Sequence, residues 1–320
     1  MTTCVDNLLS RVDSMFTEQL TTWHDAEERY RRMCHAMKRS LTLSGGTFEL
    51  IHLPDRAVST CARTDSRSIA ERPCFLCETN RPEVQLRLPL EVSGLEILVN
   101  PFPIYGRHLT IPSLSHTPQT YSKHLLEQML AIAHGLKEYT VFYNGPHSGA
   151  SAPDHLHLQA VNTTEMPQIL LGTTDSDCRI LKSDGETRLY LHPYLTTRPV
   201  TVSGTDFGKM ADMMLSALSL LPVHPDETEP RLNLYATSIS GSDKTALTAI
   251  LRDRHRPTCY GDEGVIFSPG SIDMGGRIVL PRKSDFETLT ADQLQYMLSE
   301  VLLPEETYNR FILDCISHPL

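Results

Sequence analysis

The sequence of 320 residues contains no apolar run long enough to cross a membrane. A spanning helix needs about 20 consecutive apolar residues, whereas the most apolar stretch, MMLSALSLLPV, is shorter and is interrupted by serines. The opening MTTCVDNLLSRVDSMF carries charges before any apolar stretch of signal-peptide length. We therefore expect a soluble, cytoplasmic protein that has no membrane partner.

Positive charge is also scarce, since 29 lysines and arginines face 39 aspartates and glutamates and give a formal net charge of −10. A nucleic-acid surface needs basic charge spread over a whole face, so we expect no nucleic-acid partner. Small phosphorylated ligands remain possible because a few local donors suffice for them. The length allows one large or two ordinary domains, and a composition that is 40% apolar is typical of a globular chain.

Eight cysteines are scattered through the chain, and without a signal peptide a disulfide framework is not expected. Only Cys74 and Cys77 lie close together, in a C-x-x-C spacing that lets both thiolates reach one metal ion. A redox pair or buried core cysteines would give the same spacing. Thioredoxin-like use is disfavoured because no strand of a βαβ pattern precedes the pair.

Hydrophobic periodicity predicts an α+β fold. Residues 5–38 have the pattern of one or two amphipathic helices, and short strands separated by Pro and Gly follow from TFELIHLPDRAVST onward. GLEILVNPFPIYGRHLTIPS reads as two strands joined by a turn. A helix is expected to open at Thr117 as N-cap with Pro118 in its first turn. We expect an antiparallel sheet with packed helices.

A weak internal repeat indicates two related halves. Residues 107–130 and 276–298 both read as a strand ending in Pro, a polar link and a helix ending in Met-Leu. The alternative is that the two segments are unrelated, because the succession of a strand, a proline and a helix is common in proteins. With the repeat accepted, the chain divides into an N-terminal helical segment, a first half and a second half, at residues 1–44, 45–195 and 196–320.

The stretch GASAPDHLHLQAV, residues 149–161, has the alternation of a strand. Alternation places His155, His157 and Gln159 on one face and Leu156 and Leu158 on the other. A lone histidine in a strand is usually a structural, half-buried residue. Here a loop of small residues, SGAS, precedes the pair, and such a loop lets backbone N–H groups approach an anion closely. Together the loop and the imidazoles indicate phosphate chemistry.

NGPHSGASAPDHLHLQ resembles the histidine-triad superfamily, in the transferase branch whose last triad position is Gln. That branch contains galactose-1-phosphate uridylyltransferase, diadenosine tetraphosphate phosphorylase and the GDP-hexose phosphorylases. VNPFPIYGRHLTIPSLSH is similar to the strand and turn that hold the nucleotide in these enzymes. The resemblance covers about residues 45–165 and extends more loosely into the C-terminal half. It implies a histidine-triad-like antiparallel sheet.

The resemblance also implies roles for individual residues. His157 would be the nucleophile that forms a nucleotidyl-histidine, since neutral imidazole is nucleophilic near pH 7. Gln159 would hold a phosphate oxygen without titrating. Ser151 and the backbone N–H groups of Gly149 and Ala150 would bind further phosphate oxygens. Asn144 would orient the phosphate or the nucleophile, and Asn100 would contact the ribose or the base.

A metal site is implied as well, because the family adds His116 and His155 to Cys74 and Cys77. Two thiolates and two imidazoles are the donor set and number that zinc prefers. With four protein ligands such a zinc would be structural and would carry no catalytic water.

The implied activity is a nucleotidyltransferase, of phosphorylase or uridylyltransferase type. Hydrolases of the family carry His at the position of Gln159, which favours transfer from a nucleotide sugar or dinucleoside polyphosphate to phosphate or a sugar phosphate. Hydrolysis of such nucleotides and a non-catalytic nucleotide-binding module are the alternatives. Relatives of the uridylyltransferase pair up, so a homodimer is possible.

Two departures argue against galactose-1-phosphate chemistry. Leu156 stands where the uridylyltransferase has Pro, and no second His-x-His pair is present in the C-terminal half. Basic residues near the C-terminus are candidates for the acceptor or the polyphosphate tail, although charge runs are usually solvated faces. They are Arg252, Arg254, His255, Arg256, Arg277, Arg282 and Lys283, of which Arg277 aligns with His108 in the repeat and is our substrate-binding candidate.

Overall fold

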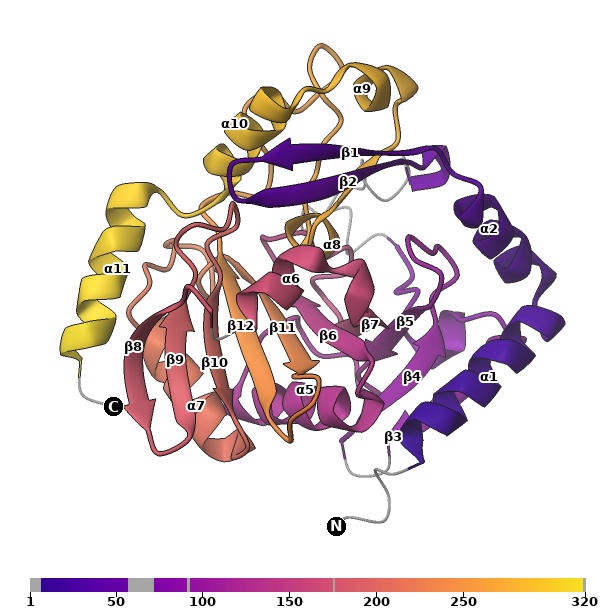
Figure 1. Ribbon diagram of the computed structural model, residues 1–320. Coiled ribbons are helices and arrows are strands. Elements are labelled where there is room, and N and C mark those ends of the chain that lie inside the picture. The colour runs from indigo at the N-terminus through magenta and orange to yellow at the C-terminus, as the bar shows by residue number, and fades with distance from the viewer. Residues whose placement is uncertain (1–6, 57–71, 91–92, 175, 319–320) are drawn as a thin grey trace.

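A ten-stranded antiparallel sheet forms the centre of the computed structural model, which describes residues 7–56, 72–90, 93–174 and 176–318 (Figure 1). The strand order is β3-β4-β5-β7-β6-β11-β12-β10-β9-β8. The strands are β3 (Arg87–Leu90), β4 (Leu95–Val99), β5 (His108–Pro112), β6 (Tyr139–Asn144), β7 (His157–Asn162), β8 (Arg179–Asp184), β9 (Thr187–Leu191), β10 (Val200–Gly204), β11 (Leu232–Ser238) and β12 (Thr245–Leu251).

The sheet consists of two related halves that meet where β6 pairs with β11. Counted from the edge inward, the first half has the order β3, β4, β5, β7, β6 and the second half the order β8, β9, β10, β12, β11. In both halves the last two strands stand in the reverse of their sequence order. One helix follows the third strand in each half: α5 (Lys123–Leu136) follows β5 and α7 (Phe207–Leu218) follows β10. The expectation of two halves and of an α+β antiparallel fold is confirmed.

The particular repeat inferred from the sequence was wrong in its second copy. Residues 276–298 begin with β13 (Arg277–Leu280), which joins a separate three-stranded sheet of order β1-β2-β13. The copy of β5 and α5 is β10 and α7 instead. β10 has no Pro at its end, whereas Pro112 and Pro281 made residues 107–130 and 276–298 look similar.

The three-stranded sheet also corrects the boundary proposed at residue 44. β1 (Lys38–Leu43) and β2 (Gly46–His52) form a hairpin in which Leu43 pairs with Gly46, so the boundary falls inside its turn. β13 then pairs with β2 in parallel, with Arg277 opposite Glu49. Residues 38–52 and 277–280, far apart in the sequence, thus share one sheet.

Two N-terminal helices, α1 (Leu8–Thr22) and α2 (His24–Cys34), lie where the periodicity predicts them. α5 begins later than expected, because the side chain of Ser122 accepts a hydrogen bond from the Leu125 amide as the N-cap, and Thr117 and Pro118 lie in the preceding loop. The other helices are α6 (Pro167–Gly172), α8 (Ser271–Met274), α9 (Lys283–Thr288), α10 (Ala291–Val301) and α11 (Glu305–Ser317), with 3₁₀ turns at Pro54–Arg56, Glu78–Asn80 and Thr163–Glu165.

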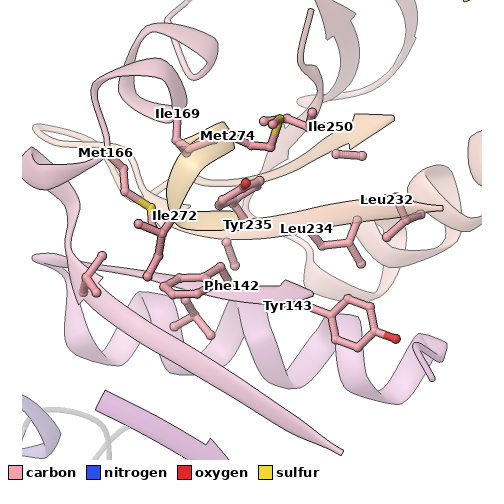
Figure 2. Packing of buried hydrophobic residues seen from close by; sticks show 14 of the residues in the cluster. Phe142, Tyr143, Met166, Ile169, Leu232, Leu234, Tyr235, Ile250, Ile272 and Met274 are labelled. Carbon is pink, nitrogen blue, oxygen red and sulfur yellow. The ribbon is translucent and has the colours of Figure 1, made fainter. Parts of the chain in front are cut away.

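Alternation along the central strands sorts side chains between the two faces of the sheet. Phe142 and Tyr235 pair across β6 and β11, and both are buried near Ile272 and Met274 of α8 (Figure 2). Tyr143, one residue on, faces the opposite side, where α5 packs against β6 and β11. Each large apolar side chain buried in this way contributes about 1.5–3 kcal/mol. Within the described ranges, no helix combines the length and apolarity of a membrane span.

Candidate functional site

The side chain of Gln119 replaces main-chain pairing at the ends of β6 and β7. The two strands pair regularly up to Phe142 and Gln159, and two residues further the same register would place Asn144 opposite His157. Instead, Gln119 Oε1 accepts from the His157 amide at 2.8 Å, and its Nε2 donates to the carbonyls of Asn144 (2.9 Å) and His157 (3.1 Å). One buried side chain therefore fixes the backbone of the central histidine. Nothing in the local sequence TPQT marks this role.

His157 is held as a neutral imidazole of defined tautomer. Its Nδ1 lies 2.8 Å from the carbonyl oxygen of His155, a group that only accepts, so Nδ1 carries the proton and Nε2 keeps its lone pair. The side chain is 4% exposed. Burial lowers the pKa of His157 to about 4, so the ring is unprotonated at neutral pH. Such an imidazole is a competent nucleophile.

His108 sets the orientation of Gln159. The Ile104 amide donates to Nδ1 of His108 at 3.4 Å, so Nε2 of His108 carries the proton and donates to Gln159 Oε1 at 2.8 Å. Burial lowers the pKa of His108 to about 3 and keeps this ring neutral. With its oxygen engaged, Gln159 has its NH₂ group left to offer a ligand.

A cavity of about 920 Å³ has His157, Gln159 and Ser151 in its lining. Part of its wall comes from the α1–α2 corner, which contributes Trp23 and Arg29, among others. The apolar residues elsewhere in the lining are Phe75, Leu76, Pro82, Val84, Leu98, Pro101 and Phe102. Polar side chains such as Asn80, Arg81 and Gln85 lie among them. Apolar surface with polar groups placed within it is typical of a small-molecule site. The contribution of the N-terminal helices could not be predicted from their own sequence.

A smaller, polar cavity of about 90 Å³ adjoins the first and shares Arg56, Ser151 and Gln159 with it. The loop residues Gly149 and Ala150 line it together with Ser151. Gly149 has φ of 101°, and a Cβ there would lie 2.6 Å from the Cα of Gly270, so only glycine fits. Opposite the loop the lining includes His255, Arg256, Ser268 and Asp273.

Two asparagines predicted to contact substrate use their amide groups inside the protein. Asn144 Oδ1 accepts from the Ser271 amide (2.7 Å) and from Asn233 (3.1 Å). Asn100 donates to Thr110 Oγ1 at 3.0 Å and accepts from the Phe102 amide at 2.8 Å. Asn144 lines the smaller cavity and Asn100 the larger one, but these bonds give both a structural role.

Arg277, the predicted substrate-binding arginine, lies in the lining of neither cavity. Its guanidinium is buried, ion-paired with Glu49 and Glu165, bonded to the Ile104 carbonyl and stacked at 4.1 Å over the ring of Tyr105. This cation is already neutralised, so the structure gives it a packing role. The alignment with His108 that suggested it came from the mistaken repeat.

Only His255 and Arg256 of the predicted basic cluster line the smaller cavity. Arg252 is buried and bonded to Asn233 and to backbone carbonyls. The others pair with neighbouring carboxylates, at Arg254–Asp253, Arg282–Asp285 and Lys283–Glu287. Arg56, which no sequence motif identified, also lines the smaller cavity.

The four predicted metal ligands are brought together. One donor atom from each of Cys74, Cys77, His116 and His155 lies within 4.8 Å of all the others. The Cys77 sulfur is 3.2 Å from His116 Nδ1, and the Cys74 sulfur is 3.3 Å from His155 Nδ1. Sulfur and nitrogen ligands of one tetrahedral ion lie about 3.5 Å apart. These residues could therefore hold a metal ion.

A second layer of contacts supports this cluster and links it to the small-residue loop. His155 Nε2 donates to the Ser113 carbonyl at 2.8 Å, and His116 Nε2 lies 3.6 Å from Asp154. Asp154 also pairs with Arg72 at 3.6 Å, and Arg72 donates to the Ser151 carbonyl at 2.8 Å. Partners of this kind fix the tautomers of metal-binding histidines.

Comparison with known proteins bears on the fold. A family model described as a domain of unknown function (DUF4922) matches residues 15–162. Yeast Ap4A phosphorylase Apa2 in complex with Ap4A superposes with a TM-score of 0.59 at 17% identity, over 89% of this chain and 97% of that one. The chain therefore shares the fold of this phosphorylase.

The crystal structure of Apa2 in complex with AMP gives a TM-score of 0.52 at 16% identity, over 90% of this chain and 97% of that chain. No curated protein matches the sequence. At these identities the Apa2 structures establish the fold, and the chemistry has to be argued from the residues of the site.

Proposed function

We propose that the protein is a nucleotidyltransferase that moves a nucleoside monophosphate group from a nucleotide sugar or dinucleoside polyphosphate to phosphate or a sugar phosphate. The observation that carries the proposal is the state of His157. Its proton is committed to the His155 carbonyl, its ring is neutral, and it lines a nucleotide-sized cavity beside Gln159 and Ser151. That Apa2 has been crystallised with AMP and with Ap4A supports a nucleotide as the ligand.

In the first step the lone pair of His157 Nε2 attacks the α-phosphorus. The bond from that phosphorus to the bridging oxygen breaks, and its electron pair leaves with the departing phosphate compound. In the second step an acceptor phosphate oxygen attacks the same phosphorus, the P–N bond breaks, and its electron pair returns to Nε2. Splitting one displacement into two in this way lowers the barrier of each.

The surrounding donors would stabilise the charge on the phosphate oxygens. Gln159 offers its NH₂ group because His108 occupies its oxygen. Ser151 and the N–H groups of Gly149 and Ala150 would bind the remaining oxygens, with Arg56 at the junction of the two cavities. Donors fixed in advance around developing charge are a large part of phosphoryl-transfer catalysis.

The Cys₂His₂ cluster would hold zinc, which the softness and number of its ligands favour. A zinc with four protein ligands supplies rigidity and no open coordination position. Such a zinc would help to position the nucleophile, because the carbonyl of its ligand His155 accepts the Nδ1 proton of His157.

Product analysis tests the proposal. The full chain is incubated with GDP-glucose, UDP-glucose, ADP-glucose and diadenosine tetraphosphate in turn, with phosphate, with galactose 1-phosphate, or with neither. A transferase yields nucleoside diphosphate only when phosphate is present, or a new nucleotide sugar only when galactose 1-phosphate is present. Release of nucleoside monophosphate at the same rate with or without phosphate would instead establish the hydrolase, and no product from any donor or acceptor would favour the binding module.

A further inference from the structure

The larger cavity runs across the sheet from the nucleophile toward the edge strand β3. Gln159, Thr110 and Leu98 pair in one row over β7, β5 and β4. Adjacent strands lie 4.7–4.9 Å apart, so this row spans roughly 10 Å. Both of its ends line the cavity, and Gln85 lies beyond Leu98, bonded to the carbonyl of the next residue, Val99. This length suits a nucleoside whose α-phosphate is at His157, so the base would lie near Gln85.

Three side chains of the cavity lining offer acceptors to a ligand. Gln85 Nε2 donates to the Val99 carbonyl at 3.1 Å, and Asn80 Nδ2 donates to the Cys74 carbonyl at 2.9 Å. An amide whose nitrogen faces a carbonyl has its oxygen turned away from it. Both residues line the cavity, and so does Asp25, whose carboxylate only accepts.

Two arginines of the lining have partners inside the protein. Arg81 pairs with the buried Glu96 at 2.6 Å, and Arg29 donates to the Pro101 carbonyl and stacks on the ring of Phe102. Trp23 contributes one further donor type to the lining, an indole N–H.

We propose that this end of the cavity selects guanine, which deepens the proposed function by naming the base. Guanine presents two adjacent donor groups, N1–H and the N2 amino group, beside the acceptor O6. Adenine presents one amino group beside an acceptor, and uracil a single N–H between two acceptors. Gln85, Asn80 and Asp25 match the donors of guanine, and the Trp23 indole matches O6.

The loop that carries Gln85 is held in place before any ligand binds. The buried Gln19 of α1 donates to the Val84 carbonyl at 2.8 Å and accepts from the Leu86 amide at 2.6 Å. Both bonds flank Gln85, so its position costs little ordering on binding. Helix α1 thereby acquires a role in recognition.

Calorimetric titration of the full chain with GMP, IMP, AMP and UMP tests this proposal without requiring turnover. IMP lacks only the N2 amino group, and leaving an acceptor unpaired should weaken its binding about tenfold relative to GMP. AMP and UMP should bind at least tenfold more weakly than GMP. Gln85→Leu should bring the GMP and IMP affinities within about twofold of each other.

Gln128→Leu is the matched control, because Gln128 also donates its amide to a backbone carbonyl, Ser93, but lies on α5. This variant should keep the order of the four nucleotides. AMP or UMP binding as tightly as GMP would overturn the proposal, as would a GMP-to-IMP ratio unchanged in Gln85→Leu. If GMP binds in the expected order while no nucleotide is ever transferred, the proposed reaction fails and base selection stands.

Discussion

The main-chain carbonyl of His155 accepts the Nδ1 proton of His157 at 2.8 Å, while the imidazole of His155 belongs to the Cys₂His₂ cluster. One residue thus joins the Cys₂His₂ cluster to the proposed nucleophile through its own covalent structure and one hydrogen bond. His155 precedes β7, contrary to the expectation that both histidines lie on the strand, and His157 is the first residue of β7. The carbonyl of the first histidine thus orients the ring of the second.

Removing a ligand of the cluster should therefore affect both stability and reaction. Cys74→Ser, or chelation of the wild type, should lower the melting temperature by about 5 °C or more, as expected for a loss of about 2–3 kcal/mol in a chain of this size. The rate of nucleotide attachment should fall in parallel. Cys34→Ser, an exposed cysteine outside the cluster, is the control. Equal behaviour of the two variants in thermal unfolding would show that the cluster holds no metal.

His108 should act through Gln159. Gln159→Leu removes a phosphate donor and should slow attachment by about 10²–10³. His108→Phe keeps a ring against Tyr105 and Phe142 but frees the Gln159 amide to rotate, and we expect about a tenfold loss. Rapid-quench rates of the double variant should be no lower than those of Gln159→Leu. Multiplied losses would mean that the two residues act independently.

Attachment should persist into mild acid. Burial lowers the pKa of His157 to about 4, so about 90% of the ring stays neutral at pH 5, where a histidine of ordinary pKa would be about 3% neutral. The single-turnover rate should change less than twofold between pH 7 and pH 5. A fall centred near pH 6.5 would show that the nucleophile titrates normally.

The buried carboxyl group of Glu229 should lower the free energy of unfolding of the wild-type protein at high pH. Its carboxylate is 4% exposed and accepts from the Tyr143 hydroxyl and the Tyr121 amide, and burial raises its pKa to about 7. A raised carboxyl pKa means that stability is greatest below the ordinary value near 4.5 and is lost as pH rises toward 7. Glu229→Gln should therefore have a free energy of unfolding, measured by urea denaturation at pH 8, that is about 1–3 kcal/mol higher than that of the wild type. At pH 4 the difference should vanish; an equal gain at both pH values would mean that ionisation is not the cause.

Local pattern was sufficient for some of this architecture. Alternation predicts that His157 and Gln159 share a face of a strand, and amphipathic periodicity predicts α1 and α2. Both signals depend only on neighbours in sequence. The Cys₂His₂ cluster could be predicted only from the family resemblance, because His116 and Cys77 come together only on folding.

Contacts between distant segments were beyond prediction. Gln119 and Arg56 carry no motif, and each acquires its role from strands or loops elsewhere in the chain. Arg277 was misplaced for the same reason: it meets Glu49 because β13 pairs with β2, and it meets Glu165 because the 3₁₀ turn Thr163–Glu165 lies beside it.

The most direct measurement is the intact mass of the full chain after incubation with a nucleotide donor and no acceptor. Denaturation is kept neutral or alkaline, because a phosphoramidate on histidine is lost in acid. We predict a gain of one nucleoside monophosphate in the wild type and in His124→Ala, an exposed histidine, and no gain in His157→Ala. An adduct that forms equally in His157→Ala, or none from any donor that the wild type turns over, would contradict the covalent mechanism.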